Sequence, residues 1–412
     1  MSAFRVAVVD AFGTSFEFTH AFGAVGGEVI QVRSTAVRPA GVDPVDERAF
    51  ARVLVHHGDL DLLTDQLAAL DPVAVLPGRE TGVELADALS ARLGLASNGT
   101  ALSAARRDKY VQIETVKAHG VPGMRQLRTG DEAELLAWHE QLGGTVVVKP
   151  LRGYWGAGVS FCDRPRDSAT ALRGLLARRT LLGEPITEVV AQEYLVGAEY
   201  IVNTVSCAGV HHLTDAWRTE RIQANGVRDL VTAQVLLRSD EPPVDELLAY
   251  GRRVLQALGI RYGPAHLEIK LTPDGPRLVE AGARISGLPS YTADLLGEGQ
   301  LEWTVDAYVR PDRFHTRAGR SYDRRQAFAW AALVAPSSGL LRRYRALDQV
   351  ERLASFRALD VLVEPGSRIA ATTYDREYPV TLELSHPVEA VLQRDLNTVR
   401  YLDGPGMYEI TP

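Results

Sequence analysis

The segment HLEIKLTPDGPRLVEAGAR, residues 266–284, places two carboxylates, Glu268 and Glu280, on either side of a turn signal. The central letters TPDGP predict a three-residue hairpin loop, because proline and aspartate suit the middle of a type I turn and glycine supplies the left-handed residue that closes it. That loop makes Thr272 the partner of Pro276. Counting outward along both strands then puts Glu268 directly opposite Glu280, on one face of the hairpin.

Two like charges in such an arrangement need an explanation. Side chains directly opposite in an antiparallel pair have Cβ atoms only about 5 Å apart, and like charges there are destabilising unless something positive lies between them. Oxygen ligands without cysteine or histidine partners favour Mg²⁺, which takes one or two carboxylates and completes its shell with water and substrate phosphates. The alternative is a solvated hairpin whose acids point to water, with Lys270 and Arg277 as partners.

Arg284 follows Glu280 by four residues, which keeps it on the same face when the strand continues. A cation at that position can stabilise the charge that develops on a transferring phosphoryl or acyl group. The alternative is an ordinary salt bridge to one of the two glutamates.

The whole chain has the composition of a soluble globular protein. Its 412 residues suggest two to four packed units, at roughly 150 residues per domain. Hydrophobic residues make up 46% and charged residues 24%, and no apolar run approaches the about 18 residues of a membrane helix. The first residues lack the features of a secretion signal, so a cytoplasmic location is expected. The net charge of −7 argues against general affinity for nucleic acid.

The order of short patterns predicts four structural units. Alternating strand-like and helix-like stretches, without a GxGxxG fingerprint, predict a parallel α/β unit over residues 1–100. Residues 101–190 contain two strands, TVVVKP and VSFC, joined by a glycine-rich connection. Antiparallel alternation and the hairpin predict a sheet in residues 191–325. Short strands and one helix-like run predict a compact α+β region over residues 326–412.

Lys149 is a candidate for phosphate binding. It ends the strand VVVKP immediately before a loop that carries Gly156 and Gly158, and a charge next to exposed backbone amides can bind phosphate. The loop is not a Walker loop, because the GKS or GKT ending and the following helix are missing. An ordinary hairpin loop is the alternative. Tyr154 and Trp155 in this loop are expected either to stack on or cover a ligand, or simply to pack.

Lys109 and Glu199 are candidates of the same kind. Lys109 lies on a helix expected over residues 101–119, with Thr100 as N-cap and a glycine stop, and either binds a ligand or belongs to a solvated basic face. Glu199 lies in AQEYLVGAEYIV, an extended segment that can hydrogen-bond an adenine edge with its backbone and a ribose with its carboxylate. An edge strand gives a similar pattern.

Other catalytic chemistries are poorly represented. The sequence has no GxSxG elbow and no HExxH, and its histidines at 56, 57, 211 and 212 come as adjacent pairs instead of at metal-binding spacing. Cys162 and Cys207 lie far apart without CxxC spacing, so neither a disulfide framework nor a zinc site is expected.

The order of these signals is more specific than any one of them. A helix lysine, a strand lysine with a glycine loop, an EYL hinge with a glutamate, two facing glutamates and an arginine follow one another along the chain. This order resembles the ATP-grasp ligases, from about Ser97 through NGTALSAARRDKYVQIETVKAHGVP, VVVKP, AQEYLVGAEYIV and HLEIK to VEAGARISG. Within that superfamily the chain looks most like the ligases that join L-amino acids into dipeptides, of the bacilysin-synthetase type.

The resemblance implies an ATP-grasp fold, with an N-terminal parallel α/β domain, a central pair of ATP-grasp subdomains and a small C-terminal α+β region. It also implies roles for individual residues. In the nucleotide site these are Lys109, Lys149, Gly156 and Gly158 for phosphates, Gln192, Glu193 and Leu195 for adenine, and Glu199 for the ribose. In the reaction site they are Glu268 and Glu280 for Mg²⁺, Arg284 and the Gly287 backbone for the acyl phosphate, and Glu80, His266 and Leu288 for the substrates.

The chain departs from the pattern of many relatives at two positions. An acidic residue often stands where this chain has Gln192, which leaves adenine recognition in place but altered. Many relatives read Glu-x-Asn-x-Arg where this chain has Gly282 between Glu280 and Arg284. The loss of the asparagine removes one metal oxygen, so a second Mg²⁺ is expected to be held more by phosphate and water.

The implied reaction joins a small carboxylate to an amine at the expense of ATP. Transfer of the γ-phosphoryl group to the carboxylate forms an acyl phosphate, the amine displaces phosphate, and an amide or peptide bond results. Mg²⁺ is the expected cofactor, with Mn²⁺ as a substitute, and a homodimer without membrane or nucleic-acid partners is expected. The alternatives are an ATP-grasp enzyme with a non-amino-acid acceptor or a carboxylase-type product, and a module that senses ATP without catalysis.

Overall fold

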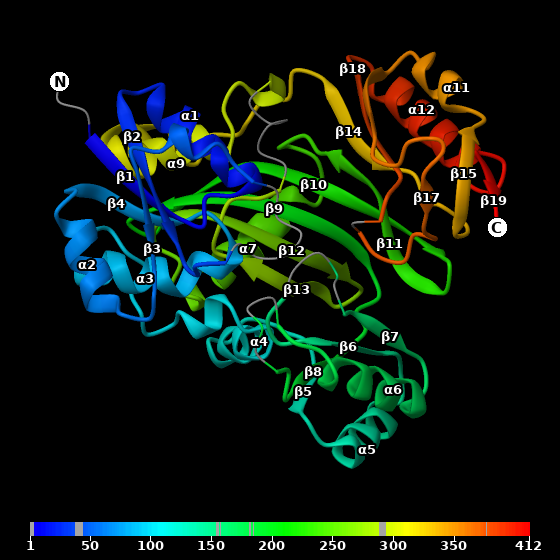
Figure 1. Ribbon diagram of the computed structural model, residues 1–412, viewed down its shortest axis with the longest axis horizontal. Coiled ribbons are helices and arrows are strands. Elements are labelled where there is room, and N and C mark those ends of the chain that lie inside the picture. The colour runs from blue at the N-terminus through cyan, green and yellow to red at the C-terminus, as the bar shows by residue number, and fades with distance from the viewer. Residues whose placement is uncertain are drawn as a thin grey trace.

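The computed structural model describes residues 4–37, 44–153, 156, 158–180, 183, 185–287, 294–375 and 377–412 (Figure 1). Its N-terminal part is a parallel sheet in the order β3-β2-β1-β4. Its members are β1 (Phe4–Val9), β2 (Gly27–Arg33), β3 (Arg52–Val55) and β4 (Pro72–Pro77), with α1 (Phe18–Gly23), α2 (Leu60–Ala68) and α3 (Val83–Arg92) around them. The nearly continuous apolar run of β1 is typical of a parallel strand that is covered on both faces. The predicted parallel α/β unit is confirmed.

A second, smaller sheet has the order β5-β8-β6-β7, and all of its pairs are antiparallel. Its members are β5 (Gln126–Thr129), β6 (Val146–Pro150), β7 (Ser160–Cys162) and β8 (Val189–Glu193), with α5 (Glu132–Leu142) and α6 (Pro165–Leu176). The two helices lie together against one face of this sheet, at the bottom of Figure 1. As predicted, the strand that ends in Lys149 pairs with the strand after the glycine-rich loop.

The central layer is an antiparallel sheet of eight strands in the order β13-β12-β9-β10-β11-β14-β18-β16. These are β9 (Ala198–Cys207), β10 (Val210–Ala224), β11 (Val227–Leu236), β12 (Gly263–Thr272), β13 (Gly275–Gly282), β14 (Ala327–Ala332), β16 (Phe356–Val361) and β18 (Val380–His386). Helix α7 (Val244–Ala257) buries its apolar stripe against this sheet, and α9 (Gln300–Val309) and α10 (Pro311–Arg317) follow the hairpin. The central sheet continues past residue 326, where a new unit was expected to begin. The boundaries expected between units therefore stay predictions.

The C-terminal region adds a small sheet in the order β17-β15-β19 to the end of the large one (Figure 1). Its elements are β15 (Gly339–Tyr344), α11 (Leu347–Glu351), β17 (Arg368–Ile369), α12 (Glu389–Leu402) and β19 (Tyr408–Thr411). Apolar side chains of α12 pack against β14 and β18, which attaches this region to the central sheet.

The helix predicted over residues 101–119 is shorter than expected. Helix α4 (Lys109–Ala118) begins after Asp108, whose carboxylate accepts hydrogen bonds from the Tyr110 and Val111 amides at 3.0 and 3.1 Å. The preceding turn is only a short 3₁₀ helix (Ala104–Arg106). The guanidinium of Arg106 is buried against Asp87 at 2.9 Å, so the chain turns inward before the helix begins.

The hairpin of residues 266–284 differs from the prediction at its turn. Thr272 pairs with Gly275, so the loop has two residues and the strands are shifted by one position relative to the expected register. A β-bulge between Ile269 and Glu268 shifts the register again, and Glu268 lies opposite Glu280. Because a one-residue slip would have moved one glutamate to the other face of the sheet, the bulge is what keeps both acids on one face.

Candidate active site

One cavity of about 610 Å³ lies where the described parts of the four regions meet. Its size is that of a pocket for a drug-sized ligand. The N-terminal region contributes Gly13, Thr14, Gly78, Arg79 and Glu80, and helix α4 contributes Lys109. The small sheet provides one wall, the strands from β9 to β13 provide the floor, and residues 373–375 and Tyr378 of the C-terminal region close one side.

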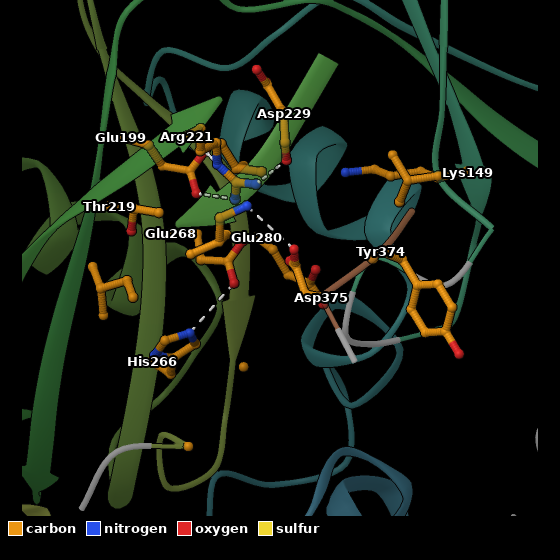
Figure 2. A pocket seen from close by; sticks show the side chains of 18 of the residues that line it. Lys149, Glu199, Thr219, Arg221, Asp229, His266, Glu268, Glu280, Tyr374 and Asp375 are labelled. Carbon is orange, nitrogen blue, oxygen red and sulfur yellow. Dashed lines mark hydrogen bonds and ion pairs between the residues drawn. The ribbon is translucent and has the colours of Figure 1, made fainter. Parts of the chain in front are cut away.

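Glu268 and Glu280 face this cavity and keep a third and a quarter of their side chains exposed, at 33% and 24%. Lys109 Nζ lies 2.8 Å from Glu280 Oε1, and His266 Nε2 lies 3.4 Å from Glu268 Oε1 (Figure 2). Burial disfavours the charge on Glu268, but the hydrogen bond and charge of His266 and the charges of Arg221 and Arg284 lower its pKa to about 2. Glu268 is therefore an anion, and each of the two acids lies against a nitrogen atom of a basic side chain.

The solvated hairpin does not account for this pair. Lys270 turns to Asp229, at 3.3 Å, and Arg277 donates to backbone carbonyl groups of its own turn. Neither side chain serves as the counter-ion of Glu268 or Glu280. The described residues form no cage of three or more His, Cys, Asp or Glu side chains, so a cation here would need further oxygen ligands from a substrate or from water.

Arg284 pairs with neither of the two glutamates. Its Nε lies 2.9 Å from Oε1 of Glu80, and Arg107 Nη1 donates to the other oxygen of Glu80 at 3.3 Å. Burial raises the pKa of Glu80, but the charges of Arg284, Arg107 and Lys109 outweigh burial and lower it. Glu80 is thus an ionised carboxylate that holds Arg284 in the cavity wall.

The glycine at position 282 has a structural reason. A Cβ atom on Gly282 would lie 2.5 Å from Glu80 Oε1, which is closer than real Cβ contacts, and a tight 3.2 Å from Arg284 Cζ. The space that an asparagine would occupy in the pattern of many relatives is therefore filled by the Glu80 carboxylate. This use of the Glu80 carboxylate was not predicted. Its one sign in the sequence is the absence of a side chain at position 282.

The two lysines differ in their partners. Lys109 Nζ donates to the Gly153 carbonyl at 2.9 Å, so it connects the start of the glycine-rich loop to Glu280. Lys149 is buried at the end of β6 and forms no hydrogen bond or ion pair with any residue that the structure describes. Burial, with the charge of Lys109, lowers the pKa of Lys149 to about 8, although Glu280, Glu268 and Glu199 oppose the shift. An anion in the cavity would supply the partner that Lys149 lacks.

The glycine-rich loop is described only in part. Gly156 and Gly158 have φ angles of 68° and 78°, the left-handed region that glycine adopts without strain. A Cβ on Gly158 would also lie 2.9 Å from Leu175, so the loop passes close to α6. The predictions for Tyr154 and Trp155 in this loop, and for Leu288 after Gly287, lie outside the described residues. Gly287 itself lines the cavity.

The segment expected to hold adenine lies at one end of the cavity. Leu195 lines it, as do the apolar side chains of Met124, Val147 and Phe161, and Val147 lies opposite Phe161 and Gln192 in the small sheet. Gln192 is buried and donates to Gln126 Oε1 at 2.9 Å. The Glu193 carboxylate instead binds the Arg125 amide and Nε at 2.7 and 2.6 Å, so only its backbone is available to a ligand at this end of the cavity.

Glu199 is buried and held by a partner that the sequence analysis missed. Arg221 of β10 donates to both of its carboxylate oxygens, at 2.5 and 3.1 Å (Figure 2). Burial disfavours the charge on Arg221, but the charge and hydrogen bonds of Glu199 outweigh it and raise the pKa of Arg221. The pair of Asp229 and Lys270 was not predicted either. Asp229 lies on β11 and Lys270 on β12, and only the order of strands in the sheet brings them together.

His266 is held from behind by a buried chain of hydrogen bonds. Its Nδ1 lies 2.9 Å from Asn203 Oδ1, while Asn203 Nδ2 donates to Asp215 at 2.5 Å. Asp215 also accepts hydrogen bonds from Trp217 Nε1 and Thr214 Oγ1. Because Asp215 accepts a hydrogen bond from Asn203 Nδ2, Asn203 presents its oxygen to His266. Nδ1 of His266 must therefore be the donor and carry a proton. Nε2 is then the nitrogen that faces Glu268 and the cavity.

Comparison with known proteins adds four findings. A model of the ATP-grasp domain matches residues 142–291. Dapdiamide A synthase from Enterobacter agglomerans is 33% identical over 348 residues, which cover 81% of this chain and 80% of that protein. The L-amino acid ligase from Bacillus licheniformis has a similar structure, with a TM-score of 0.75 at 16% identity and coverage of 100% of this chain and 99% of that one. The biotin carboxylase domain of 2-oxoglutarate carboxylase from Hydrogenobacter thermophilus, solved with MgADP, has a TM-score of 0.64 at 14% identity, with coverage of 100% and 91%.

At sequence identities of 16% and 14%, the two solved structures support only the fold of this chain. Both bear out an ATP-grasp arrangement of the whole chain, including the parallel N-terminal sheet. None of the described helices is long and apolar enough to cross a membrane.

Proposed function

The chain belongs to the ATP-grasp family of carboxylate-amine ligases, and from that membership we propose that its cavity binds ATP and passes the γ-phosphoryl group to a carboxylate substrate. The observation that carries the proposal is the convergence of Lys109, Lys149, Glu268, Glu280 and Arg284 on one cavity. An amine then displaces phosphate, and an amide bond forms with release of ADP and phosphate.

In this proposal ATP lies along the cavity from the end at Leu195 to the facing glutamates. The end at Leu195 receives adenine, and Glu199, already oriented by Arg221, accepts the ribose hydroxyl groups. Lys149 and Lys109 meet the phosphates, with the backbone of the glycine-rich loop at Gly156 and Gly158. The lowered pKa of Lys149 fits this role, since a nearby anion favours its charged form.

Glu268 and Glu280 fit the demands of Mg²⁺, because they are anionic, lie opposite each other and offer only oxygen. When bound, Mg²⁺ neutralises phosphate charge and so lowers the barrier to phosphoryl transfer. We propose Mn²⁺ as a substitute, since it accepts the same oxygen ligands. Lys109 pairs with Glu280 in the described structure, and with Glu280 engaged by a metal its ammonium group would be available to the phosphates.

Arg284 and the Gly287 backbone are proposed to hold the group in transit. The carboxylate oxygen of the substrate attacks the γ-phosphorus and ADP leaves, which produces an acyl phosphate. The amine attacks the acyl carbon, phosphate leaves with the bonding electrons, and the amine loses a proton. Both steps place negative charge near the guanidinium of Arg284, which Glu80 keeps oriented through its 2.9 Å ion pair.

The substrates are proposed to be amino acids or small acids and amines of that kind. The L-amino acid ligase is named for amino acids as substrates and dapdiamide A synthase for its product, and His266 and Glu80 line the cavity. Leu288 stays a prediction for the acceptor pocket, as does the homodimer. A non-amino-acid amine and a carboxylated product are the remaining enzymatic alternatives.

The test is phosphate release over a matrix of amino acids and small acids with several amines, with hydroxylamine added to trap an acyl phosphate. The proposal expects ADP, phosphate and hydroxamate in amounts that depend on the acid. Tight ATP binding without acid-dependent phosphate release would refute it and favour a module that senses ATP. A trapped hydroxamate from an acid that gives no product with any amino acid would identify a different acceptor.

A further inference from the structure

The C-terminal region supplies one acidic side chain to the cavity that no step above uses. Asp375 lies in the segment between β17 and β18 and lines the cavity with Tyr374 and Tyr378. Figure 2 shows Asp375 among the side chains of the cavity wall, with the facing glutamates in the same view. Its contacts indicate whether it is a structural residue or a site for a ligand.

The backbone around Asp375 is held in place from two sides. Asn225 Nδ2 donates to the Thr372 carbonyl at 2.8 Å, and the Ala335 amide donates to Thr372 Oγ1 at 3.0 Å. Tyr378 is buried, and its hydroxyl donates to the Val231 carbonyl of β11 at 2.5 Å. The segment is therefore positioned by contacts with the central sheet that do not involve the Asp375 carboxylate, in addition to those that do.

The Asp375 carboxylate itself is poorly compensated. Oδ1 lies 2.8 Å from the Tyr378 hydroxyl and 3.4 Å from the Val231 amide. The hydroxyl has one proton, which it can give either to the Val231 carbonyl or to Asp375, but not to both. Oδ2 has no hydrogen-bond partner among the residues that the structure describes. One oxygen is thus weakly bonded and the other is open to the cavity.

Among the residues that the structure describes, the nearest charges leave this carboxylate short of a cation. Arg221 is the main positive charge that acts on Asp375, but both of its terminal groups are already engaged by Glu199 and by the Asp229 carbonyl. Burial raises the pKa of Asp375, and Glu268 shifts it in the same direction, while Arg221, Tyr378 and the Val231 amide oppose the shift. A cationic ligand would compensate a charge that the described residues compensate only in part.

We propose that Asp375 binds the ammonium group of the amine substrate. The inference rests on the proposed function and adds the residue that selects a charged amine. The side chains of Leu230, Val231 and Trp330 line the cavity beside Asp375, so the amine is expected to carry an apolar group. A Cβ on Gly156 would lie 3.8 Å from Asp375 Oδ2, so this carboxylate is next to the loop proposed for the phosphates, where the acyl phosphate forms.

The test compares Asp375→Asn with the wild type in steady-state phosphate release. The acid and amino acid are the pair that the wild type uses fastest in the matrix above, and hydroxylamine, uncharged at neutral pH, is the second amine. Because a hydrogen bond to a charged group is worth about 1.5–3 kcal/mol, the KM for the amino acid as amine is expected to rise by roughly 10-fold or more. The KM values for ATP and hydroxylamine are expected to stay within about 2-fold.

Glu377→Gln is the matched control. The Glu377 carboxylate binds the Thr373 amide and hydroxyl at 3.0 and 2.8 Å, so this variant perturbs the same segment without changing the charge in the cavity. It is expected to leave the KM for the amino acid nearly unchanged. Equal effects of the two variants, an unchanged KM in Asp375→Asn, or an equal loss with hydroxylamine would overturn the inference. A wild type without acid-dependent phosphate release would instead overturn the proposed function on which it rests.

Discussion

Replacement of Gly282 by alanine isolates the contact between the N-terminal region and the hairpin. The new Cβ would lie 2.5 Å from Glu80 Oε1, so the carboxylate must move. Gly282 does not have the positive φ that penalises other residues, so backbone strain does not contribute. Glu80 is buried between Arg107 and Arg284, at 3.3 and 2.9 Å, and has little room to move without lengthening one of these pairs.

The expected loss in the free energy of unfolding is bounded by two known costs. Overpacking of a well-packed site costs about 1–3 kcal/mol, and a buried pair that is broken completely costs about 3–5 kcal/mol. Since Glu80 has two arginine partners and loses at most one, a loss of about 2–3 kcal/mol in the free energy of unfolding is expected for Gly282→Ala. The measurement is the urea dependence of unfolding, followed by tryptophan fluorescence and circular dichroism.

A double-mutant cycle with Glu80→Ala shows whether the clash is the cause. In the Glu80→Ala background the closest obstacle is gone, and the Arg284 guanidinium, 3.2 Å from the new Cβ, has lost the partner that holds it and can shift. Gly282→Ala should then cost less than about 0.5 kcal/mol, and a coupling above about 1 kcal/mol is expected. Gly144→Ala is the matched control, because a Cβ there meets no atom within 4 Å. Additive effects of the two substitutions, or an equal loss in Gly144→Ala, would refute the reasoning.

Four further expectations follow from the same contacts. Glu280→Ala and Arg284→Ala should fold but lose turnover by at least about 100-fold, by analogy with the roughly 3 kcal/mol of a lost oxyanion donor, and near-normal ADP production by both would contradict the assignment. ATP affinity, measured by calorimetry, should weaken as the pH rises through about 8, because Lys149 loses its proton there, and Lys149→Met should remove this dependence. Asp108→Ala should lower the free energy of unfolding by about 1 kcal/mol through the lost cap of α4, measured by urea unfolding. Lys109→Met should strengthen the binding of Mg²⁺ without nucleotide, since Glu280 loses its competing cation, and unchanged affinity in a metal titration would contradict this exchange.

Sequence patterns predicted the fold where local signals determine it. The buried run of β1 and the alternation after it predict a parallel sheet, and the TPDGP letters predict a hairpin. The turn length was wrong, because a two-residue and a three-residue loop use the same residues. The bulge that brings Glu268 back opposite Glu280 depends on pairing with β9 as well as on the hairpin, and therefore has no local signal.

The partners of the candidate residues were harder to predict for a related reason. Arg221 meets Glu199 because β10 lies beside β9, and Glu80 meets Arg284 across 204 positions of the chain, from 80 to 284. Such contacts depend on the order of strands and on how separate regions pack, which one sequence does not encode as a short pattern. The space at Gly282 is the exception, since a missing side chain next to two candidate residues points to a neighbour that fills it.

These partners have one property in common, which bears on how the site works. Lys109 neutralises Glu280, His266 lies against Glu268, and Arg284 is held by Glu80. For Glu80, Glu268 and Glu280 the unliganded cavity therefore avoids the cost of unpaired burial by using its own basic side chains. A metal ion by itself has to displace these cations, and a nucleotide by itself has to approach the two glutamates. With both present, Lys109 would have phosphate oxygens as partners and Glu268 and Glu280 would hold the metal, so each of these charges would keep a partner. The two ligands are therefore expected to bind cooperatively, because of the ion pairs that the site forms without them.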